Sequence, residues 1–234
     1  MKYIAVTIKV SVSKKEFPLI EINSITEVLD HLDGLSVFVF DLDDTLYSEK
    51  MYVRSGYKAI ANLLQNVSNA EERLWNFFQQ KKTAINELLL EEKIYSKELE
   101  KKCVEVYRNN TPTLCLYPHV SETLSVIREK KKLLGLITDG RPAGQRAKIK
   151  ALGIEDLFDE VIITDELGGI NMRKPSPVAF EDMQKRLSQK EKRSIPFKEM
   201  CYVGDNIHKD FIAPAQLGMK AFFFNNPDSL YYSC

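Results

Sequence analysis

The feature of this 234-residue sequence that most restricts its fold is an apolar, strand-like run that occurs four times and ends each time in Thr, Asp or Gly. These runs lie at residues 35–44, 131–140, 159–166 and 199–206, and a fifth lies at residues 219–227. Helical spacing is found at residues 120–131, 142–153 and 176–189. Strands that alternate with helices predict an α/β fold, a Rossmann-like parallel sheet with helices on both faces.

Polar side chains follow the ends of these predicted strands. Ligands of open parallel sheets bind beyond the carboxyl ends of the strands, so we expect these side chains to converge. The residues concerned are Asp41, Asp43, Thr138, Asp139, Lys174, Asp205 and Asp210.

Asp41 and Asp43 are two residues apart, so on an extended strand end their carboxylates point the same way. Ionisation of both is costly unless a cation lies between them or one stays protonated. A divalent metal would meet the first condition, and a protonated carboxyl could act as a general acid. An isolated pair of this kind also fits a turn or a helix cap. The other polar strand ends favour a functional site.

A phosphate monoester would use each of these residue types. Its charge grows on the phosphoryl oxygens and on the leaving oxygen during transfer, so it needs a cation, donors and an in-line nucleophile. Thr138 and Lys174 are donors, and Asp205 is a hard oxygen ligand of the kind that Mg²⁺ prefers. Asp41 is placed to attack. The sequence therefore favours phosphoryl chemistry with Mg²⁺ as cofactor.

Residues 49–110 interrupt the alternation, because three successive segments have helical periodicity without a strand between them. We interpret this part as an inserted helical domain that ends before Pro112. The predicted α/β catalytic core comprises residues 36–48 and 111–234.

Residues 1–35 are predicted to be an N-terminal extension packed on or near the core. Residues 1–10 alternate as a strand does. Residues 23–34 begin with Asn and Ser, either of which could cap a short helix, and end with Gly.

Four segments together resemble a known family. In order they are DLDDTLY (41–47), ITDG (137–140), RKPSP (173–177) and GDNIHKD (204–210). They resemble the four motifs of the haloacid dehalogenase-like (HAD) superfamily, and the helical insertion resembles the α-helical cap of its phosphatase branch. The resemblance covers residues 37–226.

The resemblance implies a role for each matching residue. Asp41 would form an aspartyl-phosphate, and Asp43 would protonate the leaving oxygen and later activate water. Thr138 would hold the phosphoryl group, and Lys174 would tie that group to Asp41. Mg²⁺ would be bound by Asp41, the main-chain carbonyl of Asp43 and Asp205, with Asp210 acting through water or through another ligand. The phosphate cradle would be completed by the backbone amides of Leu42, Asp43 and Asp139.

Two positions bear on the type of reaction. The second motif has Asp139 where Asn is common in the family, which leaves its backbone role intact and its side-chain role open. Asp43 stands two residues after the predicted nucleophile, where the dehalogenase branch lacks a carboxylate and the phosphatases keep one. Asp43 therefore favours phosphoryl transfer over cleavage of a carbon–halogen bond.

Composition narrows the range of partners. The 33 basic residues equal the 33 acidic ones, so no nucleic acid or acidic membrane surface is expected as a partner. No secretory signal or apolar span is found in the sequence, and we predict a cytoplasmic protein. Its four scattered cysteines indicate neither a zinc site nor a disulfide framework.

We therefore expect a Mg²⁺-dependent phosphatase that acts on a small phosphorylated metabolite, either a sugar phosphate or a nucleoside monophosphate. A phosphomutase would use the same residues, and a non-catalytic binding protein could keep the same fold. The oligomeric state is left open. Four residues near the first motif are candidates to face the substrate: Tyr47, Lys50, Arg54 and Tyr57.

Overall fold

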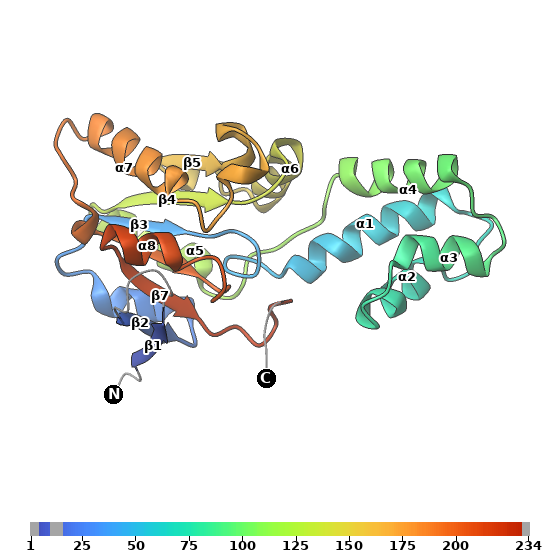
Figure 1. The fold of residues 1–234 in the computed structure, drawn as a ribbon, viewed down its shortest axis with the longest axis horizontal. Coiled ribbons are helices and arrows are strands. Elements are labelled where there is room, and N and C mark those ends of the chain that lie inside the picture. The colour runs from blue at the N-terminus through green and yellow to red at the C-terminus, as the bar shows by residue number, and fades with distance from the viewer. Residues whose placement is uncertain (1–4, 10–15, 231–234) are drawn as a thin grey trace.

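The computed structural model describes residues 5–9 and 16–230, which form a helix-covered sheet and an elongated group of helices beside it (Figure 1). The strands are β1 (Ala5–Lys9), β2 (Glu16–Ile22), β3 (Val37–Phe40), β4 (Leu133–Thr138), β5 (Glu160–Ile163), β6 (Met200–Gly204) and β7 (Lys220–Phe224). The α-helices are α1 (Glu49–Leu63), α2 (Ala70–Gln79), α3 (Ala84–Glu91), α4 (Lys97–Asn109), α5 (Val120–Glu129), α6 (Pro142–Leu152), α7 (Val178–Lys190) and α8 (Ile212–Leu217). Short 3₁₀ helices are η1 (Ile25–His31), η2 (Glu155–Leu157), η3 (Thr164–Leu167), η4 (Ile170–Met172) and η5 (Phe197–Glu199).

The strands form one sheet in the order β1-β2-β7-β6-β3-β4-β5. Only β1 runs antiparallel to its neighbour, and the other neighbours are parallel. Phe40 at the end of β3 is in register with Leu136 of β4 and Val203 of β6. These three central strands therefore end within two residues of one another, and the residues that follow them share one edge.

Both faces of the sheet are covered, which explains why the central strands are apolar without alternation. Phe38 and Phe40 pack in the same apolar cluster as Leu124 of α5. Val39, on the opposite face, packs in a second cluster with Met183 of α7. The predicted α/β class, with a parallel sheet and helices on both faces, is confirmed.

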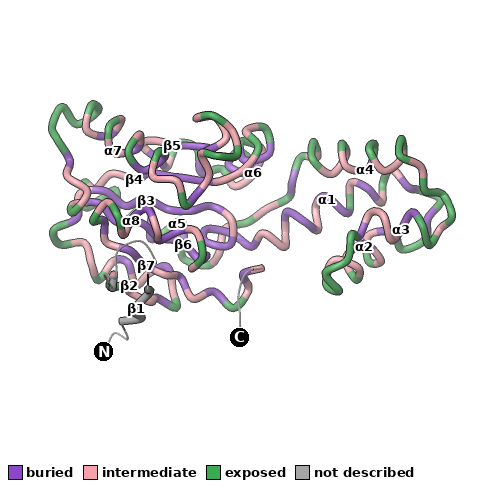
Figure 2. Tube along the Cα trace, in the orientation of Figure 1, coloured by how far each residue is buried: buried purple, intermediate pink, exposed green. Residues whose placement is uncertain are grey.

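Helices α1 to α4 have an apolar core of their own, which includes Ile60, Leu74, Leu88 and Cys103. Figure 2 shows buried residues recurring along α1 and exposed residues covering the outer turns of α4. The second of the three helical segments expected within residues 49–110 covers residues 69–93, and the structure divides it into α2 and α3 by a turn in which Lys81 has a φ of 58°. These helices occupy the part predicted as a cap domain, and that division of the chain stays a prediction.

The N-terminal residues extend the sheet. Strand β2, which periodicity does not predict, pairs in parallel with β7. The strand predicted at 1–10 corresponds to β1, while residues 1–4 and 10 lie outside the described residues. The helix predicted at 23–34 is the 3₁₀ helix η1, which begins after Ser24 with a capping box formed by Ser24 and Glu27. Over the described part of the chain, every helix is too short or too polar to cross a bilayer.

Candidate active site

Three buried carboxylates meet beyond the carboxyl ends of the central strands. Asp41 follows β3, Asp205 follows β6, and Asp210 lies in the turn before α8. One oxygen of each lies within 4.8 Å of the others. The backbone of β3 and β6 sets this arrangement, since the Asp41 amide donates a hydrogen bond to the Val203 carbonyl at 2.9 Å.

A single buried lysine joins two of these carboxylates. Lys174 Nζ lies 2.7 Å from Asp41 Oδ1 and 2.8 Å from Asp210 Oδ1, and it donates a hydrogen bond to the Tyr202 hydroxyl at 2.8 Å. The contact with Asp210 has the distance of an ion pair without the geometry of a hydrogen bond. Burial works against the charge on Lys174, but Asp210 and Asp41 outweigh it and raise the lysine pKa above its usual value.

Burial and mutual repulsion raise the pKa values of two of these carboxylates. Burial raises the pKa of Asp41 to about 6, although Lys174 works in the opposite direction. Burial, followed by repulsion from Asp210 and Asp41, raises the pKa of Asp205 to about 8. When all three are ionised, these carboxylates carry two more charges than the one ammonium group that contacts them, which is the electrostatic setting that a divalent cation stabilises.

The donor set fits such a cation. Carboxylate oxygens are hard ligands, and Asp41 and Asp205 each keep an oxygen that is not in contact with Lys174. Asp210 is held from both sides, because its Oδ2 accepts a hydrogen bond from the Asn206 amide at 2.9 Å and its Oδ1 faces Lys174. Only glycine fits beside it at position 204, since a Cβ there would lie 2.6 Å from Asp210 Oδ2.

Asp43 points away from the other carboxylates, toward α6. Its Oδ1 lies 2.7 Å from Lys148 Nζ and accepts a hydrogen bond from the Tyr47 hydroxyl. Its Oδ2 accepts one from Gln145 Nε2 at 2.9 Å. Burial works against the charge of Asp43, but Lys148 and these hydrogen bonds outweigh it and lower the pKa of Asp43.

Thr138 is fully buried at the end of β4, and its hydroxyl accepts a hydrogen bond from Gln145 Nε2. Gln145 therefore contacts both Asp43 and Thr138, two residues that are far apart in the sequence. The structure thus brings the predicted residues together in two adjoining groups. Asp41, Lys174, Asp205 and Asp210 form one, and Asp43 and Thr138 form the other.

Asp139 links the second motif to the third. Its Oδ1 accepts hydrogen bonds from the Lys174 amide at 3.1 Å and from the Thr164 hydroxyl at 3.0 Å. Its Oδ2 lies 3.4 Å from Lys209 Nζ. The side chain of Asp139 therefore holds the backbone that carries Lys174.

Sequence reasoning missed several polar residues in and around the site, among them Gln145, Lys148 and Asp44. Gln145 and Lys148 lie three residues apart on one face of α6, and both are buried. The signal for them was a glutamine and a lysine at that spacing directly after the second motif. Asp44 is also buried, and it accepts hydrogen bonds from the amides of Glu49 and Leu230, both at 2.7 Å. It joins the start of α1 to the C-terminal segment.

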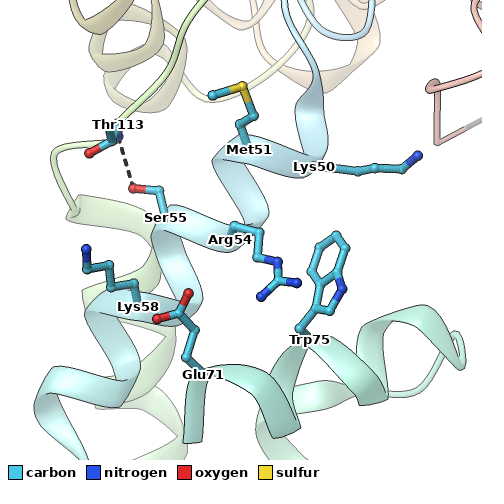
Figure 3. Close-up of a pocket in the computed structure, with 8 residues that line it drawn as sticks. All are labelled: Lys50, Met51, Arg54, Ser55, Lys58, Glu71, Trp75 and Thr113. Carbon is cyan, nitrogen blue, oxygen red and sulfur yellow. Dashed lines mark hydrogen bonds between the residues drawn. The ribbon is translucent and has the colours of Figure 1, made fainter.

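A pocket of about 380 Å³ opens on the helical group, away from the carboxylates. Its lining includes Lys50, Arg54 and Lys58 of α1 with Glu71 and Trp75 of α2 (Figure 3). The Arg54 guanidinium lies 4.2 Å above the centre of the Trp75 ring, so this side chain is already engaged.

The other candidates near the first motif are also engaged within the protein. Tyr47 is buried against Asp43, and Lys50 Nζ pairs with Asp228 at 2.9 Å. Tyr57 is turned into the apolar core of α1 to α4. None of these three described side chains contacts the carboxylates of Asp41, Asp205 and Asp210.

The sequence matches the model of a known protein family. Residues 35–218 match the family model for haloacid dehalogenase-like hydrolase, which is well over half of the chain. The chain belongs to the haloacid dehalogenase-like hydrolase family. It is therefore an enzyme of the hydrolase class, and the resemblance found in its four motifs is confirmed.

Relatives of this HAD hydrolase include phosphatases. Glyceraldehyde 3-phosphate phosphatase of Methanopyrus kandleri is 32% identical over 201 residues, which cover 79% of this chain and 82% of the relative. The enzyme of the same name from Methanocaldococcus jannaschii is 28% identical, over 77% of this chain and 81% of the relative.

Solved structures share the fold of this HAD hydrolase. YfnB of Bacillus subtilis, which was solved bound to magnesium, superimposes with a TM-score of 0.58 at 18% identity. The match covers 82% of this chain and 87% of YfnB.

Proposed function

We propose that this HAD hydrolase is a Mg²⁺-dependent phosphatase that hydrolyses a small sugar phosphate through a phosphorylated Asp41. The observation that carries the proposal is the group formed by Asp41, Asp205 and Asp210 around Lys174. This group supplies a nucleophile, cation ligands and an ammonium donor at the carboxyl edge of a parallel sheet, where ligands of such sheets bind.

The substrate class follows from the relatives. The two relatives named above act on glyceraldehyde 3-phosphate, according to their names, and the chain matches each over most of its length. A triose phosphate is therefore the first substrate to test, and nucleoside monophosphates form the comparison class.

The cation would be held by Asp41 and Asp205, with Asp210 acting through water. When bound, Mg²⁺ supplies positive charge to the phosphoryl oxygens and to the carboxylates around it. Lys174 supplies further positive charge beside Asp41 Oδ1 and keeps that carboxylate oriented.

In the first step, a carboxylate oxygen of Asp41 attacks phosphorus while the bond to the leaving oxygen breaks. Asp43, which carries a proton in the substrate complex, gives that proton to the leaving oxygen, and the dephosphorylated alcohol departs. The Thr138 hydroxyl and Lys174 hold the phosphoryl oxygens. The product of this step is phosphorylated Asp41 with an ionised Asp43.

In the second step, Asp43 takes a proton from a water molecule, and the water oxygen attacks phosphorus. The bond between phosphorus and the Asp41 oxygen breaks, which releases inorganic phosphate. Asp41 is again a carboxylate and Asp43 is again protonated, so the cycle closes with one water consumed.

The proposal is tested with a panel of phosphate monoesters, incubated with Mg²⁺ or with a chelator. We expect the wild type to release inorganic phosphate from a triose phosphate only when Mg²⁺ is present. An Asp41→Asn variant should lose turnover and remain folded, whereas Asp33→Asn, a change at an exposed aspartate, should not change the rate. Full activity of the Asp41→Asn variant would contradict the proposal. A requirement for a bisphosphate would instead indicate a phosphomutase.

A further inference from the structure

Helix α6 carries two buried polar side chains whose contacts are concentrated on Asp43 and Thr138. The helix begins with Pro142 at its first turn and ends at Gly153, which has a φ of 65°, so its register is set at both ends. That register turns Gln145 and Lys148 inward, where they are 4% and 5% exposed. Long polar side chains are rarely buried to this extent unless they have partners.

Gln145 uses one amino group for two acceptors. Its Nε2 donates to Asp43 Oδ2 at 2.9 Å and to the Thr138 hydroxyl oxygen. An amide nitrogen has two hydrogens, so both donations are satisfied at once. The neighbouring carboxylate also fixes the orientation of the amide, because the opposite orientation would place the amide oxygen against Asp43.

The hydrogen bond from Gln145 also determines what Thr138 can do. Because the threonine oxygen accepts from Gln145, its own hydrogen stays available for another acceptor. A phosphoryl oxygen is such an acceptor under the proposed function. Through one amino group, Gln145 thus orients both the Thr138 hydroxyl, which is a donor, and the Asp43 carboxylate, which is the proposed acid and base.

Lys148 holds the other oxygen of Asp43. Its Nζ lies 2.7 Å from Asp43 Oδ1 and 4.4 Å from the centre of the Tyr52 ring of α1. Burial works against the charge on Lys148, but Asp43 and Glu49 outweigh it and raise the lysine pKa. A buried ammonium group that loses its carboxylate partner is strongly destabilising, so the position of Asp43 and that of Lys148 depend on each other.

We propose that Gln145 and Lys148 are positioning residues for the proposed phosphatase reaction. They hold the Asp43 carboxylate in a fixed relation to the Thr138 hydroxyl, so that the group that moves protons and the group that binds the phosphoryl oxygens act on one substrate. This inference rests on the proposed function and extends it to α6, outside the residues of the four motifs.

The test compares two esters that differ in their need for a proton. An alkyl phosphate such as glyceraldehyde 3-phosphate has a poor leaving group that must be protonated, whereas p-nitrophenyl phosphate does not need an acid in the first step. The quantity to compare is kcat/KM, because it reports the steps up to the first departure of the leaving group. General acid catalysis contributes roughly 10²- to 10⁴-fold, so Asp43→Asn should lose about that factor with the alkyl ester alone.

A Lys148→Met variant should also lose kcat/KM for the alkyl ester alone, but by a smaller factor than Asp43→Asn. We expect a loss of about 10- to 100-fold in kcat/KM for the alkyl ester, because displacement of a catalytic group by about 1 Å has effects of that order. The aryl ester should be hydrolysed almost as fast as by the wild type. Lys148→Arg, which keeps a cation beside Asp43, should recover part of the loss. Lys150→Met, on the exposed side of the same helix, is the matched control and should not change either rate.

The Gln145→Leu variant should lower kcat/KM for both esters, because it releases Thr138 as well as Asp43. The loss should be larger for the alkyl ester. Adding Lys148→Met to Asp43→Asn should cause no further loss, since the two residues would act through one function. If Lys148→Met does not fold, Lys148→Gln keeps a donor toward Asp43 and serves in its place.

Two outcomes would overturn the inference. Equal losses for both esters in a folded Lys148 variant would indicate a role in structure alone, and so would additive effects of the Asp43 and Lys148 changes. Both outcomes leave the proposed function intact, because the wild type would still hydrolyse the esters. A wild type that hydrolyses no monoester would instead overturn the proposed function, and the inference with it.

Discussion

At the scale of single residues, Asp139 shows how a carboxylate can serve the site without facing the substrate. Its Oδ1 accepts hydrogen bonds from the Lys174 amide and from the Thr164 hydroxyl, and its Oδ2 faces Lys209. Both Oδ1 contacts need an acceptor but no negative charge. An asparagine side chain offers the same acceptor, which explains in physical terms how Asn and Asp can both stand at this position.

We therefore expect Asp139→Asn to keep most of the activity and Asp139→Ala to lose it. The alanine variant leaves the buried Lys174 amide without its acceptor, which costs about 1–3 kcal/mol and releases the backbone that positions the ammonium group. Steady-state kinetics of both variants with one phosphate ester check this. Equal activity of the two variants would contradict the role of the Asp139 oxygen.

The carboxylates were easier to predict than their supports. Asp41 and Asp205 stand at the ends of continuous apolar runs, and Asp210 lies five residues after Asp205 in the same motif, so their convergence follows from the rule for parallel sheets. Gln145 and Lys148 lie within a helix, where a polar residue usually faces solvent. Their inward direction depends on how α6 is rotated against the sheet, and the helical period alone leaves that rotation open.

At the scale of elements, the N-terminal residues are an integral part of the sheet. Leu19 of β2 is fully buried in the apolar cluster on the α7 side, and Ile22 is fully buried on the other side. Alternate residues of β2 thus contribute to the cores on both faces. Packing of this kind makes β2 a source of stability for the whole sheet.

Leu19→Ala should lower the free energy of unfolding by about 2–5 kcal/mol, the usual cost of a large-to-small change in a buried position. Leu90→Ala in α3 is the control, since Leu90 is 58% exposed. Urea unfolding of both variants measures the difference. A Leu19 variant as stable as the control would show that β2 adds little to the core.

The elements that sequence reasoning missed are short or contain proline. Strand β2 includes Pro18, which lowers strand propensity. Pro18 is in register with Thr7 of the edge strand β1, and the pairing of β2 with β7 begins only at Ile20. Helix α8 has six residues and includes Pro214, too few for a periodic pattern. The long strands and helices of the core were predicted because burial on one or both faces leaves a clear pattern in the sequence.

At the scale of the whole molecule, the site lies where the sheet meets the helical group. Helix α1 begins at Glu49, directly after the first motif (Figure 1). Lys148 of α6 contacts the ring of Tyr52 in α1. The buried carboxylates thus lie at the junction of two separately packed cores. Burial and repulsion between these groups disfavour their ionisation, and a bound cation would offset that effect.

Mg²⁺ binding should therefore release protons. The pKa of Asp205 is raised to about 8, so in the metal-free protein this carboxyl holds a proton at pH 7, and a cation must displace it. We expect release of roughly one proton per ion at pH 7 and an affinity that rises with pH until pH passes about 8. Titration calorimetry in buffers with different ionisation enthalpies measures the release. An affinity independent of pH would contradict this account of the site.

Phosphorylation of Asp41 tests the central claim most directly. The protein is mixed with substrate and Mg²⁺, quenched in acid and reduced with borohydride, which converts an aspartyl-phosphate to homoserine; peptide mass spectrometry then locates the change. We predict homoserine at position 41 in the wild type, with more of it in an Asp43→Asn variant given p-nitrophenyl phosphate. Turnover without any modification at position 41, or with modification at another carboxylate, would contradict the account.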